Sequence, residues 1–237
     1  MKHLSLILII LILSCCPLHP AYAFFDKDIR LLTMRDGLAD NTIPCIYKDE
    51  DGFMWFGTDN GLSRYDGKTI QNFKPANTYV SIAAIVRLSD DFLGIVSDGY
   101  LYYFNRKRET FLPIHTESDT AIGVFNVLPA DDSSFWGISG NRLILCQWEI
   151  QQGKEEEKTA VRVRIQKTFQ LLEEKGEVFS SLCYHEKAGS GIWLTTNRGN
   201  LILFHPDTPG AYQKIPLTDG KTLQVTSILN RDGVVWV

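Results

Sequence analysis

The sequence predicts an all-β fold built from repeated four-stranded antiparallel units, and three observations support this class. Short apolar or alternating runs of β-prone residues recur along the chain. Asp-Gly and Asn-Gly pairs, which favour tight hairpins, separate many of these runs. The set of four runs returns about every 40 to 45 residues, which is typical of the blades of a β-propeller.

The composition indicates a folded protein with few possible nucleic-acid contacts. The chain has 237 residues, of which 44% are hydrophobic and 22% are charged, so disorder and collagen-like structure are excluded for the whole. Its 24 Lys and Arg residues face 28 Asp and Glu residues, giving a net charge of -4. Because no positive excess is present to neutralise phosphates, we expect no nucleic-acid partner.

The N-terminus carries the pattern of a signal peptide. Lys2 precedes an apolar run over residues 4–13, which is shorter than the roughly 20 residues needed to cross a bilayer. Small residues at Ala21 and Ala23 then match the positions that a signal peptidase requires. We therefore expect residues 1–23 to be removed before Phe24, and the mature chain to be periplasmic.

An alternative processing site remains open at Cys15. Residues 12–15, ILSC, are similar to a bacterial lipobox, in which the cysteine is lipidated and becomes the new N-terminus. After cleavage at Ala23 only Cys45, Cys146 and Cys183 remain, and this odd number gives no disulfide framework. Since all three lie in apolar runs, we interpret them as small buried side chains.

The first repeat unit shows the pattern most clearly. Its four β-prone runs are TIPCIYK, FMWFGT, LSRYD and TIQNF. Asp51-Gly52, Asn60-Gly61 and Asp66-Gly67 lie between successive runs, and each pair is a hairpin signal. The unit is therefore predicted to be a four-stranded antiparallel meander.

Weaker copies of this unit follow along the chain. The third copy is longer because a charged segment, residues 151–158, separates its last two strands, and we interpret that segment as a solvated hairpin tip. The predicted blades lie at about residues 41–75, 80–115, 122–169 and 178–217, with the start of the next at 224–237.

The repeat count predicts an incomplete ring. A propeller avoids open sheet edges by closing on itself, commonly with 4 to 8 blades and with one blade shared between the two termini. Residues 27–33 read as an outer closing strand for such a shared blade. Four complete units and the start of a fifth leave that blade unfinished, so the sequence is expected to be a fragment of a longer protein.

The motif of the first unit resembles the two-component regulator propeller repeat. The residues that carry the resemblance are Asp36–Leu38, Asp51–Thr58, Asn60–Leu62 and Tyr65–Gly67, in the order DGL, DGFMWFGT, NGL and YDG. The later units depart from the motif. The second has Gly94 in place of the tryptophan, and the third and fourth lack the preceding Asp-Gly, which the fifth recovers together with Trp236.

The resemblance implies a function that the residues themselves do not specify. Proteins of this family form the exported sensor half of hybrid two-component systems in Bacteroidota, followed by a membrane helix and a cytoplasmic histidine kinase of the phosphorelay. The resemblance therefore implies carbohydrate sensing in signal transduction, an oligosaccharide ligand, a dimeric full-length protein and an inner-membrane anchor. The motif itself is explained by folding: Trp55 packs between blades, and Gly57 allows two sheets to approach closely.

The sequence contains no motif that carries catalysis, a cofactor or a metal. A Walker loop, a HExxH helix, a paired CxxC, a nucleophile elbow and a GxGxxG turn are all absent, and the 5 histidines are scattered. The acidic segment Lys48–Gly52 is somewhat similar to the Asp box of sialidases, but its spacing differs by one residue and a β-turn explains it. We therefore predict no catalytic residue, no cofactor and no metal ligand.

A ligand site, if present, is expected on loops at one face of the propeller. The loops that join second to third strands, and those that join one unit to the next, share that face, and polar planar groups with an occasional aromatic suit sugars. A simple turn-forming role is the alternative at each position. The candidate ligand-binding residues are Arg35, Asp36, Asn41, Asp59, Asn60, Asp98, Tyr100, Asn197 and Arg198.

Three functions are therefore compared. The first is the sensor segment just described. The second is a stand-alone exported or lipid-anchored propeller that binds a ligand, which Cys15 as the true N-terminus favours. The third is a propeller glycosidase or lyase, which needs a cluster of carboxylates or Tyr and His that these loops do not supply.

Overall fold

A computed structural model of the chain describes residues 30–74, 80–116, 122–151, 160–185, 191–208, 210, 212–217, 225, 227–231 and 234–237. The chain divides into two compact units, Met1–Leu32 and Thr33–Val237, and the strands found among the described residues belong to the second. The predicted signal peptide, residues 1–23, and Cys15 lie outside the described residues.

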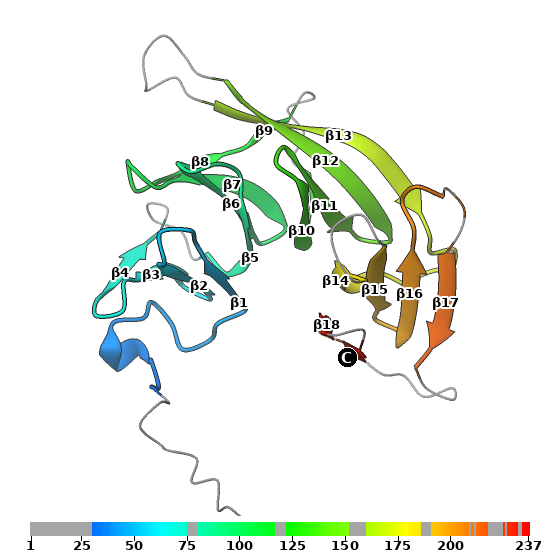
Figure 1. Ribbon diagram of the computed structural model, residues 1–237, viewed down its shortest axis with the longest axis horizontal. Coiled ribbons are helices and arrows are strands. Elements are labelled where there is room, and N and C mark those ends of the chain that lie inside the picture. The colour runs from blue at the N-terminus through cyan, green and yellow to red at the C-terminus, as the bar shows by residue number, and fades with distance from the viewer. Residues whose placement is uncertain are drawn as a thin grey trace, which may run out of the picture. The chain divides into compact units, whose positions relative to one another are not determined.

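Apart from β9 (His115–Thr116), which pairs in parallel with the edge of the third sheet, the strands form four antiparallel meanders and one hairpin, coloured in chain order in Figure 1. Blade 1 contains β1 (Cys45–Lys48), β2 (Met54–Thr58), β3 (Gly61–Tyr65) and β4 (Ile70–Phe73). Blade 2 contains β5 (Ile82–Arg87), β6 (Phe92–Ser97), β7 (Tyr100–Asn105) and β8 (Thr110–Pro113). Blade 3 contains β10 (Asn126–Asp131), β11 (Ser134–Ser139), β12 (Arg142–Gln151) and β13 (Ala160–Gln170). Blade 4 contains β14 (Phe179–Tyr184), β15 (Ile192–Thr196), β16 (Asn200–Phe204) and β17 (Tyr212–Pro216).

The first strands of successive blades are neighbours. β1 contacts β5, β5 contacts β10, β10 contacts β14, and β14 contacts β18 (Leu229–Arg231), which pairs with β19 (Val234–Trp236). Adjacent sheets that meet through their first strands, with later strands placed outward, are the arrangement of a β-propeller. The structure confirms the predicted fold class, with four blades and the start of a fifth.

The turn residues explain why these segments form hairpins. Asp98 and Gly99, between β6 and β7, both have positive φ, at 49° and 80°. Positive φ at both central residues is the requirement of a type I′ turn, whose twist matches that of the flanking strands. The Asp-Gly pair in the sequence is therefore a direct cause of this hairpin.

Blades 1 and 2 are joined by a buried aromatic triad. Trp55 on β2, Phe73 on β4 and Phe104 on β7 lie with ring centroids 5.0 to 6.0 Å apart. Trp55 is fully buried, and its indole nitrogen donates a 2.7 Å hydrogen bond to the buried carboxylate of Asp49. The tryptophan of the repeat thus packs between blades, as the sequence predicts.

Blades 3 and 4 repeat the same triad, whereas blades 2 and 3 do not. Trp136, Phe169 and Phe204 lie with centroids 4.8 to 6.3 Å apart at the boundary of blades 3 and 4. At the boundary of blades 2 and 3, Gly94 holds the tryptophan position, and Cys146 holds the position of Phe104 in the strand register. Aliphatic side chains of β5 and a stacked Phe–Trp pair in blade 3 fill this boundary instead.

The predicted closing strand, residues 27–33, stays a prediction, because the blade that would pair with it is not among the described residues. Residues 30–33 form no strand, and residues 27–29 lie outside the described residues. Thr33 instead caps the short helix η1 (Met34–Asp36), because its hydroxyl accepts a hydrogen bond from the Arg35 amide and its amide donates to the Asp36 carboxylate. These capping bonds commit Thr33 to the start of a helical turn.

Candidate functional site

The predicted loop residues of blade 1 lie together, but their side chains hold the loop itself. The Asp36 carboxylate accepts bonds from both the amide and the hydroxyl of Thr33, each 2.9 Å. Asn41 Oδ1 accepts a 2.9 Å bond from the Met34 amide. Arg35 is exposed on η1. Of these three candidates, Arg35 is the one whose side chain faces solvent without a capping role.

The β2–β3 turn is fastened to the same loop. Asn60 Nδ2 donates to the carbonyl of Ala39 at 3.2 Å, and Asp59 Oδ1 accepts a 2.7 Å bond from the Ser81 hydroxyl at the entry to blade 2. The structure therefore brings Asp59 and Asn60 beside the segment that contains Asn41. Their polar groups join the chain entries of blades 1 and 2.

The candidate ligand-binding residues of blade 2, Asp98 and Tyr100, are both exposed. Asp98 lies in the left-handed turn described above, and the side chain of Tyr100 is 51% exposed. The carbonyl of Gly99 accepts a 2.8 Å bond from the Val124 amide, which ties this turn to the entry of blade 3. Tyr100 is thus an exposed aromatic on a turn that hydrogen bonds hold in place.

The candidates of blade 4 are also engaged in the turn. Asn197 accepts a 3.0 Å bond from the Val178 amide and donates to the Gly176 carbonyl at 3.1 Å. Arg198 pairs with Glu174 and donates to the Lys175 carbonyl at 2.7 Å. The bonds of Asn197 run within blade 4, so this turn is held separately from that of blade 1.

A buried carboxylate supports the blade 4 turn. Glu177 accepts bonds from Asn200 at 2.7 Å, Thr196 at 2.9 Å and Lys214 at 3.0 Å. Burial raises the pKa of Glu177, but these three hydrogen bonds and the Lys214 charge outweigh it and hold the pKa below its usual value. The group is an ionised structural anchor.

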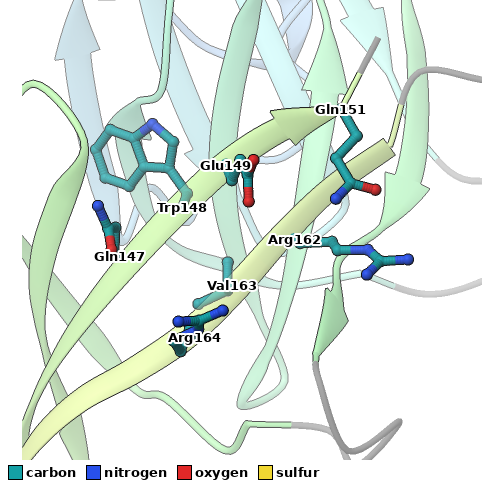
Figure 2. A pocket seen from close by; sticks show the side chains of 7 residues that line it. All are labelled: Gln147, Trp148, Glu149, Gln151, Arg162, Val163 and Arg164. Carbon is teal, nitrogen blue, oxygen red and sulfur yellow. The ribbon is translucent and has the colours of Figure 1, made fainter. Parts of the chain in front are cut away.

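A polar hollow that is lined by none of these candidate residues lies on the long hairpin of blade 3. Its volume is about 420 Å³, and Figure 2 shows the side chains around it. Strands β12 and β13 have 10 and 11 residues and extend beyond the other strands of their blade in Figure 1. The hollow is lined by Gln147, Trp148, Glu149, Gln151, Arg162, Val163 and Arg164.

In each of the two strands, successive side chains point to opposite faces of the sheet, and this determines which side chains face outward. Val161, Val163 and Trp148 are buried in the apolar cluster between blades 2 and 3. Arg162 and Arg164, which alternate with those valines, are exposed. The sequence signal is the alternation VRVR over residues 161–164, which lies within the third predicted blade and away from the loops where the sequence predicts a site.

A second hollow of about 200 Å³ lies between blades 3 and 4, beside Asp131 and Tyr184. Bonds from the Ser134 hydroxyl and the Ser133 amide hold the pKa of Asp131 below its usual value. Burial, with a smaller effect of the Asp131 charge, raises the pKa of Tyr184 to about 12. Near neutral pH the carboxylate is therefore ionised and the phenol protonated, and both pKa values lie away from the neutral range in which general acids and bases are most efficient.

The described residues hold no group of three or more His, Cys, Asp or Glu side chains placed to bind a metal ion. In the same part of the chain, no helix has both the length and the apolarity to cross a membrane.

One family matches the sequence over a short segment. The family described as "Two component regulator propeller" matches residues 37–60, which run from the end of η1 to the β2–β3 turn of blade 1. No curated protein matches the chain by sequence. The match therefore rests on the one unit in which the full motif is present.

Solved structures show the same fold at low sequence identity. Virginiamycin B lyase from Staphylococcus aureus aligns at TM-score 0.56 and 14% identity, over 81% of this chain and 60% of its own. The WD40 propeller of Doa1 aligns at TM-score 0.56 and 11% identity, over 81% and 59%. These similarities show the propeller fold.

Extracellular domains of proteins described as hybrid two-component systems from B. thetaiotaomicron are also similar. One aligns at TM-score 0.50 and 16% identity, over 78% of this chain and 31% of its own. Two structures of another align at TM-score 0.40 and 15% identity, over 82% of this chain. This chain spans 37% and 36% of the length of those two.

Proposed function

Because the chain carries a repeat of the two-component regulator propeller family, we propose that it is part of the extracytoplasmic sensor of a hybrid two-component histidine kinase. The family match at residues 37–60, on a blade with the complete repeat motif, carries the proposal. The fold of an extracellular domain from such a system, at TM-score 0.50, supports it.

The ligand proposed for this sensor is an oligosaccharide that signals the presence of a polysaccharide. Trp55, Asp49 and Gly57 of the repeat are engaged in packing and hydrogen bonding, so the motif builds the scaffold. Ligand recognition then falls to polar and aromatic side chains at the surface, such as Arg35 and Tyr100. A signal further requires that the ligand bind two states of the full protein with different affinities.

The proposed location is the periplasm. The sequence supports it through the signal-peptide pattern of residues 1–23, and the alternative lipidation site at Cys15 also leads to an exported protein. The kinase, the dimer contacts and a membrane helix are placed in further segments of the full protein. This segment is expected to have no turnover of its own.

Calorimetric titration of the full ectodomain with a library of oligosaccharides tests the sensor. The expected result is saturable binding of one class of glycan, with a matching rise in kinase-dependent transcription when cells receive that glycan. The absence of binding to every member of a chemically diverse glycan library contradicts the proposal. Binding without any transcriptional response instead favours the second candidate, an exported binding propeller anchored through Cys15.

A further inference from the structure

Two opposite charges face each other across the β12–β13 hairpin without forming an ion pair. Glu149 and Arg162 are direct cross-strand partners in the antiparallel register, a position where opposite charges commonly interact. Within the described residues no ion pair or hydrogen bond joins them. Figure 2 shows the two side chains at the hollow, together with that of Gln151. Their charged groups are therefore presented to solvent.

The remaining polar groups stand on the same outward side. Gln147 pairs with Arg164 in the register, and its side-chain carbonyl accepts a 2.9 Å bond from Gln166. Arg162 and Arg164 are two residues apart on one strand, a separation of about 7 Å. Among the described residues of the lining, two guanidinium groups stand against the one carboxylate of Glu149, which gives this part of the hollow a net positive charge.

The hairpin under the hollow is held firmly. Trp148 stacks on Phe135 with centroids 5.8 Å apart, and Val161 and Val163 are buried beneath the strand. β9 (His115–Thr116), the chain leaving blade 2, pairs in parallel with Arg162 and Val163. Backbone pairing on both edges of β13 fixes the arginine positions before any ligand arrives, which lowers the entropic cost of binding.

The chemistry of this lining selects its ligand. A guanidinium group binds a carboxylate through two parallel hydrogen bonds. Glutamine amides both donate hydrogen bonds to sugar hydroxyls and accept them, and the Glu149 carboxylate accepts them. A purely anionic ligand gains nothing from Glu149, and a neutral sugar gains little from two arginines. A sugar chain that carries both hydroxyl and carboxylate groups uses all of them.

We propose that the outward face of the β12–β13 hairpin binds acidic oligosaccharides, those built from uronic acids. The proposal rests on the proposed sensor function, names the ligand class and adds a place of contact separate from Arg35 and Tyr100. Arg162 and Arg164 hold the carboxylates, and Glu149 with the glutamines orients the hydroxyls. The occupied volume is that of the hollow, about 420 Å³.

Calorimetric titration of the full chain with oligomers of galacturonic, glucuronic and mannuronic acid, and with neutral oligomers of galactose, glucose and mannose of equal length, tests this site. We expect binding of at least one acidic series and weaker or no binding of its neutral counterpart. Arg162→Gln is expected to weaken that binding about tenfold, the loss of one charge-assisted contact. Lys167→Gln removes the same charge from an exposed residue of the same strand, outside the hollow, and is expected to leave the affinity unchanged.

Glu149→Gln gives a second readout that a structural role does not move. It keeps hydrogen bonding to hydroxyls and removes the charge that repels a carboxylate, so acidic oligomers are expected to bind equally or more tightly. Equal losses for Arg162→Gln and Lys167→Gln overturn the site. Binding of neutral oligomers that Arg162→Gln leaves unchanged overturns the site but keeps the proposed sensor function. No binding of either series also overturns the site, and the proposed sensor function is then decided by the titration of the full ectodomain with the wider glycan library.

Discussion

The boundary between blades 1 and 2 and the boundary between blades 2 and 3 use the same strands of the repeat but different side chains. The first has the triad of Trp55, Phe73 and Phe104. The second has Gly94 and Cys146 at two equivalent positions and is filled by aliphatic side chains from β5. The comparison shows that the propeller geometry requires the boundary to be filled, and that the aromatic triad is one of several ways to fill it.

The two boundaries also differ in charge. Arg106 of blade 2 reaches Asp49 and Asp51 of blade 1, while Arg64 pairs with Glu109 and Arg87 with Glu50. The Asp49 side chain is 2% exposed and also accepts the Trp55 bond, so the aromatic and ionic contacts form one network. The boundary of blades 2 and 3 depends on apolar contacts in its described residues.

The largest expected effect comes from removing the tryptophan of the first boundary. Trp55→Ala deletes a fully buried side chain and leaves Asp49 without its indole donor, so we expect a loss of about 3 to 5 kcal/mol in the free energy of unfolding. Urea denaturation of the purified protein measures it. Trp236→Ala is the matched control, because Trp236 is 63% exposed, and we expect a change below about 0.5 kcal/mol. Similar losses in both variants contradict the role given to the triad.

A smaller loss is expected from the ionic contact. Arg106→Met keeps much of the side-chain volume but leaves the buried Asp49 carboxylate without its cation, which costs about 2 to 3 kcal/mol. Lys107→Met changes a 75% exposed neighbour and is expected to cost less than about 0.5 kcal/mol. Thermal unfolding of the two variants side by side measures the difference, and an unchanged midpoint for Arg106→Met shows that the pair contributes nothing.

The second boundary is predicted to resist an added methyl group. A Cβ at Gly94 lies 2.7 Å from Val86 Cγ1 and 3.1 Å from Leu88 Cδ2, so Gly94→Ala overfills this space and costs about 1 to 2 kcal/mol. Gly123→Ala places its Cβ 3.9 Å from the nearest atom and is the control. If Gly94→Ala stabilises the protein, the aliphatic filling is looser than the distances indicate.

The smallest effect concerns the thiol at the second boundary. Burial raises the pKa of Cys146 from its usual value near 9 to about 12, so the folded thiol is neutral at mildly alkaline pH. The folded pKa lies above the unfolded one, so this burial contributes stability that is complete below about pH 9 and declines as pH rises towards 12. Iodoacetamide should label Cys183, which is partly exposed, faster than Cys146 in the folded protein. Equal labelling rates contradict the close packing of this boundary.

The sequence predicts the fold well because its signals are local. Asp98-Gly99 makes a hairpin through its own backbone angles, and Trp55 marks a second strand whose outward contact is another blade. Such features need no knowledge of distant residues. The closing strand at residues 27–33 stays a prediction, because such a strand depends on a partner from a distant part of the chain, and the capped helical turn that begins at Thr33 gives no information about that partner.

The candidate site is harder to predict for the same reason. Asn41, Asp59 and Asn197 have the polar groups that sugars require, but in the structure those groups are already bonded. Asn41 and Asn197 accept bonds from backbone amides, and Asp59 accepts a bond from the Ser81 hydroxyl. The hollow on the hairpin depends on which arginines face outward. A register shift between Leu145 and Cys146 influences that orientation, and such a shift cannot be identified from strand propensity.

The order of pairing within each blade has a consequence for how the chain is made. Every strand of blade 1 pairs with its neighbour in sequence, so residues 45–73 contain all the partners that this sheet needs. A blade can therefore form as soon as its own segment leaves the ribosome or a secretion pore, before the following segment is available. Each new blade then adds to the apolar side of the last, and the chain is predicted to fold in the direction in which it emerges.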